Sequence, residues 1–143
     1  MKRCEPPTNA PPPEPFSLLL DETLSGKSIV QALKSHGIPV VPHEEFAARG
    51  ISDIALMDSM HHHPELYFLT RDRDFRYKKD IVATLQRNGV GAFVLTASGN
   101  RTGAQLIAII LQAWPAIARF VLRHSRPFVA KILGDGSVHL HNE

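Results

Sequence analysis

Three aspartates stand where an α/β sheet would bring their carboxylates to one edge. Asp21 directly follows the apolar residues 16–20, and Asp72 comes soon after the apolar residues 66–69. Asp53 falls in the first turn of a predicted helix. In a parallel sheet, strand ends and helix starts share one edge, where ligands bind. Carboxylates gathered there repel one another, and Mg²⁺ or Mn²⁺, which prefers oxygen ligands, would remove that repulsion. We therefore predict that these aspartates bind metal and are the catalytic residues.

Charged residues of both signs surround Asp72 in the sequence. If the chain is extended over residues 70–74, Asp72 and Asp74 point to the same side, and Asp74 becomes a further metal ligand. Arg71 and Arg73 then point the other way, where they can bind the phosphates of a substrate. A metal held by the aspartates can generate hydroxide and stabilise an in-line displacement at phosphorus. A structural interpretation stays open for each acid, as a helix-start residue, a turn residue or an ion-pair partner.

Length and composition limit the class of protein. A chain of 143 residues suffices for one domain with a real core. Its 16 basic and 14 acidic residues give a net charge of +2, too small to indicate nucleic-acid binding by itself. The single cysteine, Cys4, excludes an internal disulfide and a cysteine metal site. The first residues lack the apolar region of a secretory signal. The most apolar run, 106–114, is shorter than the ~20 residues that span a bilayer, so we expect a cytoplasmic protein without a membrane segment.

Strand and helix patterns alternate along the chain. Apolar runs bounded by turn residues predict strands at 16–20, 39–41, 66–69 and 90–95. Helical spacing of apolar residues predicts four helices. The first ends near residue 36, the second begins after Ser52, and the other two cover 79–87 and 102–124. Pro115 should kink or split the last of them. Residues 128–133 and 137–140 flank Gly-Asp-Gly and predict a hairpin. The alternation predicts a three-layer α/β/α fold with a mostly parallel central sheet and a C-terminal β-hairpin.

The chain divides into three parts. The proline-rich residues 1–15 predict a disordered or polyproline-type tail. Residues 16–125 form the predicted α/β domain, and residues 126–143 form the hairpin that packs on the same domain.

The ordered set of motifs resembles a PIN-like nuclease domain, of the compact branch whose first strand ends in Leu-Asp-Glu. The matching pieces are LLLDETL at 18–24, HGIPVV ending at 41, GISDIALM at 50–57, LYFLTRDRDF at 66–75, GAFVLTA at 91–97 and RPFVAKILGDGSVHL at 126–140. They cover nearly everything after the proline-rich segment. The resemblance implies a PIN-like α/β/α fold and a Mg²⁺- or Mn²⁺-dependent ribonuclease similar to toxins of VapC type.

The resemblance also implies roles for single residues. Asp21 matches the first-strand acid, Asp53 the helix-start acid and Asp72 the third-strand acid, and Asp74 matches the extra acid of the Asp-x-Asp-Phe piece. It implies hydrolysis of RNA that leaves a 5′-phosphate and a 3′-hydroxyl, and a cognate antitoxin protein that blocks the site. Longer PIN domains have a hydroxyl or amide residue soon after the first acid, a position that Thr23 fills approximately.

A fourth carboxylate and the function itself have open alternatives. Longer PIN domains carry a further glutamate, and Glu22, Glu44 and Glu45 are the candidates here. A non-catalytic PIN-like module could bind RNA or a protein partner through the same cleft. A receiver-like phosphoacceptor domain, phosphorylated on Asp72, is a third interpretation, but no lysine follows residues 90–95 as that fold requires. The apolar surplus of the last predicted helix, which includes Ile109, allows a homodimer.

Overall fold

A mostly parallel sheet forms the centre of the structure, a computed structural model that describes residues 16–97 and 101–141. In this part of the chain the sheet has six strands in the order β2-β1-β3-β4-β5-β6. The strands are β1 (Ser17–Leu20), β2 (Val40–Val41), β3 (Leu66–Thr70), β4 (Gly91–Leu95), β5 (Phe128–Ile132) and β6 (Val138–Leu140). Neighbours are parallel from β2 to β5, and only β5 and β6 are antiparallel. The predicted tail, residues 1–15, lies outside the described residues.

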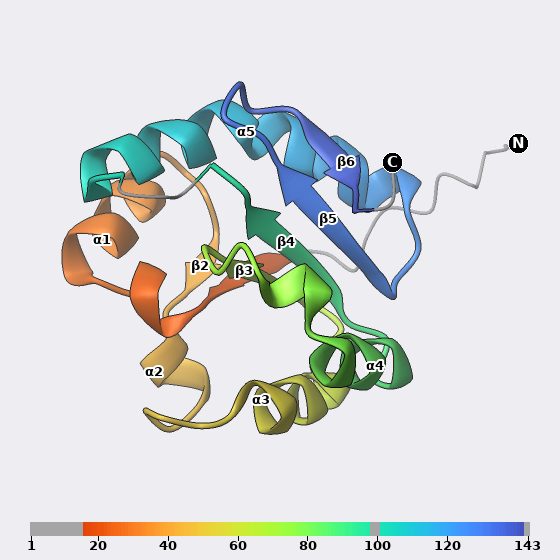
Figure 1. The fold of residues 1–143 in the computed structure, drawn as a ribbon. Helices are drawn as coiled ribbons and strands as arrows, with labels where there is room; N and C mark the ends of the chain where they lie inside the picture. Colours follow the sequence, from red (N-terminus) through yellow and green to blue (C-terminus); the bar gives the residue numbers. More distant parts are fainter. Residues whose placement is uncertain (1–15, 98–100, 142–143) are drawn as a thin grey trace, which may run out of the picture.

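Helices cover both faces of the sheet (Figure 1). They are α1 (Lys27–Ser35), α2 (His43–Phe46), α3 (Asp53–Ser59), α4 (Lys79–Arg87) and α5 (Gly103–Arg123), with the 3₁₀ turns η2 (Glu22–Leu24), η3 (Met60–His62) and η4 (Phe75–Tyr77). One apolar cluster joins α1 and α5 to the sheet, and the other joins α3 and α4 to its opposite face. The predicted three-layer α/β/α fold with a C-terminal hairpin is confirmed.

The strand periodicity explains how the two apolar clusters form. Leu18 and Leu20 of β1 belong to the cluster under α1 and α5, whereas Leu19 belongs to the cluster under α3 and α4. Successive strand residues point to opposite faces, and both faces are covered, so β1 and β3 read as continuous apolar runs. All of Leu66–Thr70 is buried. The charged residues that follow β1 and β3 therefore lie where the chain leaves the buried sheet.

Two helices differ from the sequence expectation. Residues 43–46 form the short helix α2, which has Pro42 at its N-cap, where the sequence indicated no helix. Four residues are too few for an apolar period to show. Of the kink or split predicted at Pro115, the split is wrong, because α5 continues through it from Gly103 to Arg123. Proline removes one helical hydrogen bond, but the buried side chains of Ala113 and Ile117 hold the helix on the sheet on either side of it.

The helix α5 is also long and apolar enough to cross a membrane by length and composition, with a mean hydropathy of 1.6 over an 18-residue window. The sequence expectation considered only the shorter run at 106–114 and underestimated this length. The core helix of a soluble protein passes the same test. In α5 the apolar residues Leu106, Ile110 and Ile117 are buried in the cluster shared with the sheet, and 39% of the apolar window is buried. Packing in the core therefore accounts for part of its composition.

Candidate functional site

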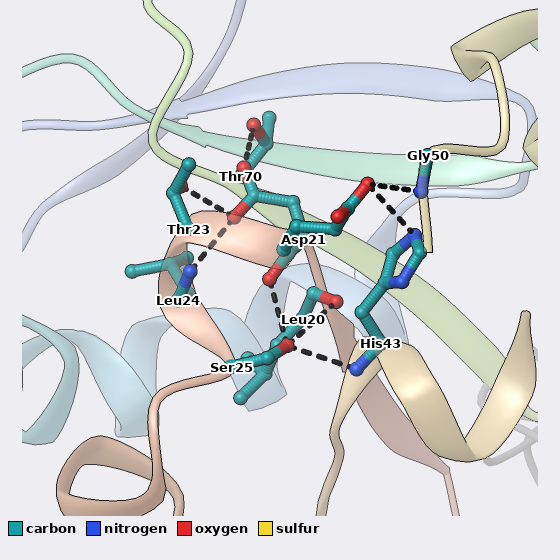
Figure 2. Close-up of polar contacts among 9 residues, drawn as sticks. Leu20, Asp21, Thr23, Leu24, Ser25, His43, Gly50 and Thr70 are labelled. Atoms are coloured by element: carbon teal, nitrogen blue, oxygen red, sulfur yellow. Dashed lines mark hydrogen bonds and ion pairs between the residues drawn. The ribbon is translucent and has the colours of Figure 1, made fainter. Parts of the chain in front are cut away.

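The Asp21 carboxylate joins the end of β1 to the end of β3 (Figure 2). Its Oδ1 accepts hydrogen bonds from the Thr23 hydroxyl at 2.7 Å and the Leu24 N–H at 3.0 Å. Its Oδ2 accepts from the Thr70 hydroxyl and, at 3.2 Å, from the Arg71 N–H. A carboxylate has about four lone-pair sites, so these donors occupy all of them. Asp21 is therefore a fixed, structurally important acid, and Thr23 lies where the resemblance placed a hydroxyl.

Asp72 lies on the other side of the same hydroxyl. The Asp72 N–H donates to Thr70 Oγ1 at 3.0 Å. Its carboxylate accepts from the Asp74 N–H at 3.0 Å and from Lys78 Nζ at 2.6 Å. The hydrogen bond from Lys78 to the Asp72 carboxylate is the main reason why the pKa of Lys78 is raised. Asp72 is thus paired with a lysine of its own chain.

Asp53 is the first residue of α3, after Ser52, which caps the helix as predicted. Burial raises the pKa of the Asp53 carboxyl above its ordinary value. The Lys78 cation opposes that rise, and the negative charges of Asp72 and Asp21 add to it. Three segments distant in sequence therefore bring carboxylates close enough to interact.

A cavity of about 190 Å³ lies between these acids. Its carboxylates are those of Asp21, Glu22, Asp53 and Asp72. The side chains of Thr23, His43 and Thr70 also line it. Glu22 and His43 are shared with a neighbouring cavity of about 300 Å³, and Asp53 is shared with one of about 450 Å³ that Lys78 also lines. The acids thus lie in a series of adjoining hollows.

The other predicted site residues lie elsewhere. The chain does not stay extended after β3: Asp74 has helical φ and ψ angles, and the buried Phe75 turns inward onto Phe68, with ring centroids 5.5 Å apart. The expectation that Asp74 points with Asp72 is therefore wrong, and Asp74 is exposed. Arg73 is exposed and Arg71 is half-buried. None of these three side chains lines the cavity.

Of the three glutamates considered as a fourth carboxylate, Glu22 lines the cavity with the aspartates. Glu44 lines the neighbouring cavity instead. Glu22 Oε1 accepts a hydrogen bond from the Gly50 N–H at 3.2 Å and lies 3.8 Å from His43 Nε2. The first turn after β1 thus supplies two acids, Asp21 and Glu22.

Several site residues were missed by the sequence interpretation. His43 is buried, and its N–H donates to Ser25 Oγ at 2.8 Å. That hydroxyl donates in turn to the Asp21 carbonyl oxygen at 2.7 Å (Figure 2). A signal existed for Thr70, because it is a polar residue at the end of an apolar strand. No sequence signal pointed to Lys78 as a partner of Asp72, because the spacing of the two residues along the chain follows no common motif.

The donor types suit Mg²⁺ or Mn²⁺, which prefer carboxylate oxygens. As the side chains lie, however, the described residues contain no group of three or more His, Cys, Asp or Glu placed to hold a metal ion. Lys78 holds Asp72, and hydrogen bonds occupy Asp21. An ion between Asp21, Asp53 and Asp72 would therefore require Lys78 to release Asp72 and one donor to leave Asp21.

A family model described as a PIN-like domain matches residues 17–97, more than half of the 143-residue chain. The chain belongs to the PIN-like domain family. The predicted family is thereby confirmed, and the match includes Asp21, Asp53 and Asp72. No match was found among curated proteins or solved structures. PIN-like domains are commonly nucleases and generally use divalent metals, which gives the acid-lined cavity its most direct interpretation.

Proposed function

We propose that this PIN-like domain is a Mg²⁺- or Mn²⁺-dependent endoribonuclease that hydrolyses RNA phosphodiester bonds. The supporting observation is the cavity of about 190 Å³ lined by Asp21, Asp53 and Asp72. These residues come from the end of β1, the start of α3 and the segment after β3. Burial raises the pKa of the Asp53 carboxyl, and the negative charges of Asp72 and Asp21 add to that rise; a divalent cation bound beside Asp53 would oppose it.

Each residue of the site has a distinct part in this proposal. A divalent cation bound by the three aspartates would supply a hydroxide nucleophile and stabilise charge at phosphorus. The hydroxyls of Thr23 and Thr70 hold the Asp21 carboxylate in one orientation. Lys78, once it is released from Asp72, remains beside the cavity as a cation that can donate to a phosphate oxygen.

The test is cleavage of RNA with Mn²⁺ or Mg²⁺, with EDTA as the metal-free control. Asp72→Asn should abolish cleavage. Asp58→Asn is the matched control, because Asp58 is an exposed carboxylate at the other end of the helix that begins with Asp53. Asp74→Asn should retain cleavage, since Asp74 lies outside the cavity. Cleavage that survives Asp72→Asn would refute the proposed site.

A second function, a non-catalytic module that binds RNA or protein, has one observation in its favour. Lys78 neutralises Asp72 at 2.6 Å, and the described residues form no three-ligand group. A chain that has its own cation in the site can retain the fold without the reaction. Tight RNA binding without metal-dependent turnover would support this function over the nuclease.

The toxin role, the antitoxin partner, the homodimer and the cytoplasmic location remain predictions. Expression of the wild-type chain should arrest growth if it is a toxin, whereas Asp72→Asn should not. Size-exclusion chromatography tests the homodimer. Ile109 and Phe120 are only 7% and 6% exposed, so a dimer would have to use other residues, such as Leu122, which is 49% exposed.

A further inference from the structure

The strands β5 and β6 present a second face that is polar and basic. Ala130 and Ile132 of β5 are buried toward α5. Lys131 lies between them along the strand and therefore points to the opposite face. The register pairs Lys131 with His139, and directly paired residues share a face. Lys131 is only half-buried, so this face is partly open.

Residues of η4 adjoin that face. The rings of Tyr77 and His141 lie 5.2 Å apart, and the guanidinium carbon of Arg76 lies 4.8 Å from the Tyr77 ring centroid. Burial lowers the pKa of His141, and the cations of Arg76 and Lys131 lower it further, so these basic groups are close together. We call Arg76, Tyr77, Lys131 and His141 the basic platform.

Two properties of the basic platform indicate an anionic, aromatic ligand. Tyr77 is 61% exposed, although its ring is flanked by a guanidinium and an imidazole. Nε and Nη1 of Arg76 are buried and have no hydrogen-bond acceptor among the described residues. A buried polar group without a partner is costly, and negative charge placed beside Arg76 would offset part of that cost.

The platform is also close to the acid-lined cavity along the chain. The turn η4, which carries Arg76 and Tyr77, lies between Asp72 and Lys78. Asp72 and Lys78 are themselves paired at 2.6 Å. Arg76 and Tyr77 therefore lie within a few residues, along the chain, of both members of that pair.

We propose that the basic platform binds single-stranded RNA, with one base stacked on Tyr77 and neighbouring phosphates beside Arg76 and Lys131. Base stacking on exposed aromatic rings beside cations is how single strands are held without sequence readout, and it requires bases that are not already stacked in a duplex. The cations of Arg76 and Lys131 complement the phosphates of a single strand. The inference rests on the proposed function, because it supplies the path of the RNA strand into that cavity.

Fluorescence anisotropy of a labelled single-stranded RNA of about 12 nucleotides tests the platform, in EDTA so that no cleavage occurs. Tyr77→Ala should weaken binding by roughly 5- to 150-fold, which corresponds to the loss of one stacked base. Tyr77→Phe should retain binding. Arg76→Gln should reduce the slope of log affinity against log salt by about 1. Arg119→Gln, which removes an exposed arginine of α5 on the other face, is the matched control and should bind like the wild type.

Each contrary outcome has a separate meaning. Equal affinity of Tyr77→Ala and wild type, with both folded by circular dichroism, would overturn the inference, as would an equal loss in Arg119→Gln. Absence of RNA binding by the wild type would overturn it in favour of a protein partner. Cleavage that needs Asp72, together with normal binding by Tyr77→Ala, would overturn the platform and leave the nuclease standing. Binding that depends on Tyr77 without metal-dependent cleavage would support the platform and refute the nuclease.

Discussion

Replacement of Asp21 by asparagine should destabilise the fold as well as remove a metal ligand. The carboxylate accepts bonds from two hydroxyls and two backbone N–H groups. Asparagine keeps one acceptor oxygen but places an NH₂ group against the donors on the other side. When the NH₂ group takes the place of Oδ2, which faces β3, the Thr70 hydroxyl and the Arg71 N–H lose their acceptor.

The size of the effect follows from those two lost bonds. A hydrogen bond to a charged group contributes about 1.5–3 kcal/mol, and partial exposure reduces the sum. We expect Asp21→Asn to lower the free energy of unfolding by about 2–4 kcal/mol. Asp72→Asn removes only a partly exposed ion pair with Lys78, whose side chains are 44% (Lys78) and 39% (Asp72) exposed. Such a pair contributes about 0.2–1 kcal/mol.

Urea unfolding of both variants and the wild type, in EDTA, measures the contrast. In thermal unfolding, at about 3–5 °C per kcal/mol for a domain of this size, Asp21→Asn should melt roughly 6–20 °C below the wild type, and Asp72→Asn within about 5 °C of it. Equal stability of the two variants would refute the reasoning that Asp21 joins β1 to β3. If the contrast is found, lost activity in Asp21→Asn cannot be assigned to catalysis alone, so Asp72→Asn is the cleaner catalytic test.

Three further outcomes follow from the structure. Lys78→Met should tighten Mn²⁺ binding in calorimetry, because it frees Asp72 from a competing cation; weaker binding would show that the lysine assists the metal. Gly91→Ala should destabilise the fold by about 1–3 kcal/mol in urea unfolding, since its Cβ would lie 2.7 Å from Tyr67 Cδ2, and unchanged stability would contradict that contact. The raised pKa of Asp53 means that its ionisation weakens the metal-free fold as the pH rises above 3.8, its ordinary value. The stability of Asp53→Asn relative to wild type should therefore increase from acidic to neutral pH in EDTA, and a difference that does not change with pH would argue against the shift.

Elements with a strong apolar pattern could be predicted from the sequence. Strands β1, β3 and β4 are buried almost throughout, so most of their residues are apolar, and the polar Ser17 and Thr70 stand at strand ends. The helix α4 was predicted with its observed bounds, Lys79–Arg87. Where tertiary packing overrides local preference, prediction failed: α2 is too short to carry a period, and α5 passes through Pro115 because its neighbours are buried on the sheet.

In the candidate site, too, some residues could be predicted from the sequence and others could not. Asp21, Asp53 and Asp72 could be placed together because topology alone fixes strand ends and helix starts at one edge. Asp74 could not be placed correctly, because the burial of Phe75 turns the chain after Asp72. Glu22 could be named as a candidate but not chosen over Glu44 and Glu45, and Lys78, which lines the adjoining cavity, could not be predicted, because turns without periodicity position both residues.

The family match ends at residue 97, before α5 and β5 begin, yet the apolar cluster on one whole face of the sheet includes side chains from both. During synthesis, chains emerge from the N-terminus and domains fold as units. The segment that carries the acids therefore leaves the ribosome with that face of its sheet covered only by α1. Until α5 follows, that nascent segment presents apolar surface of the kind that chaperones bind, and only the last third of the chain completes the core.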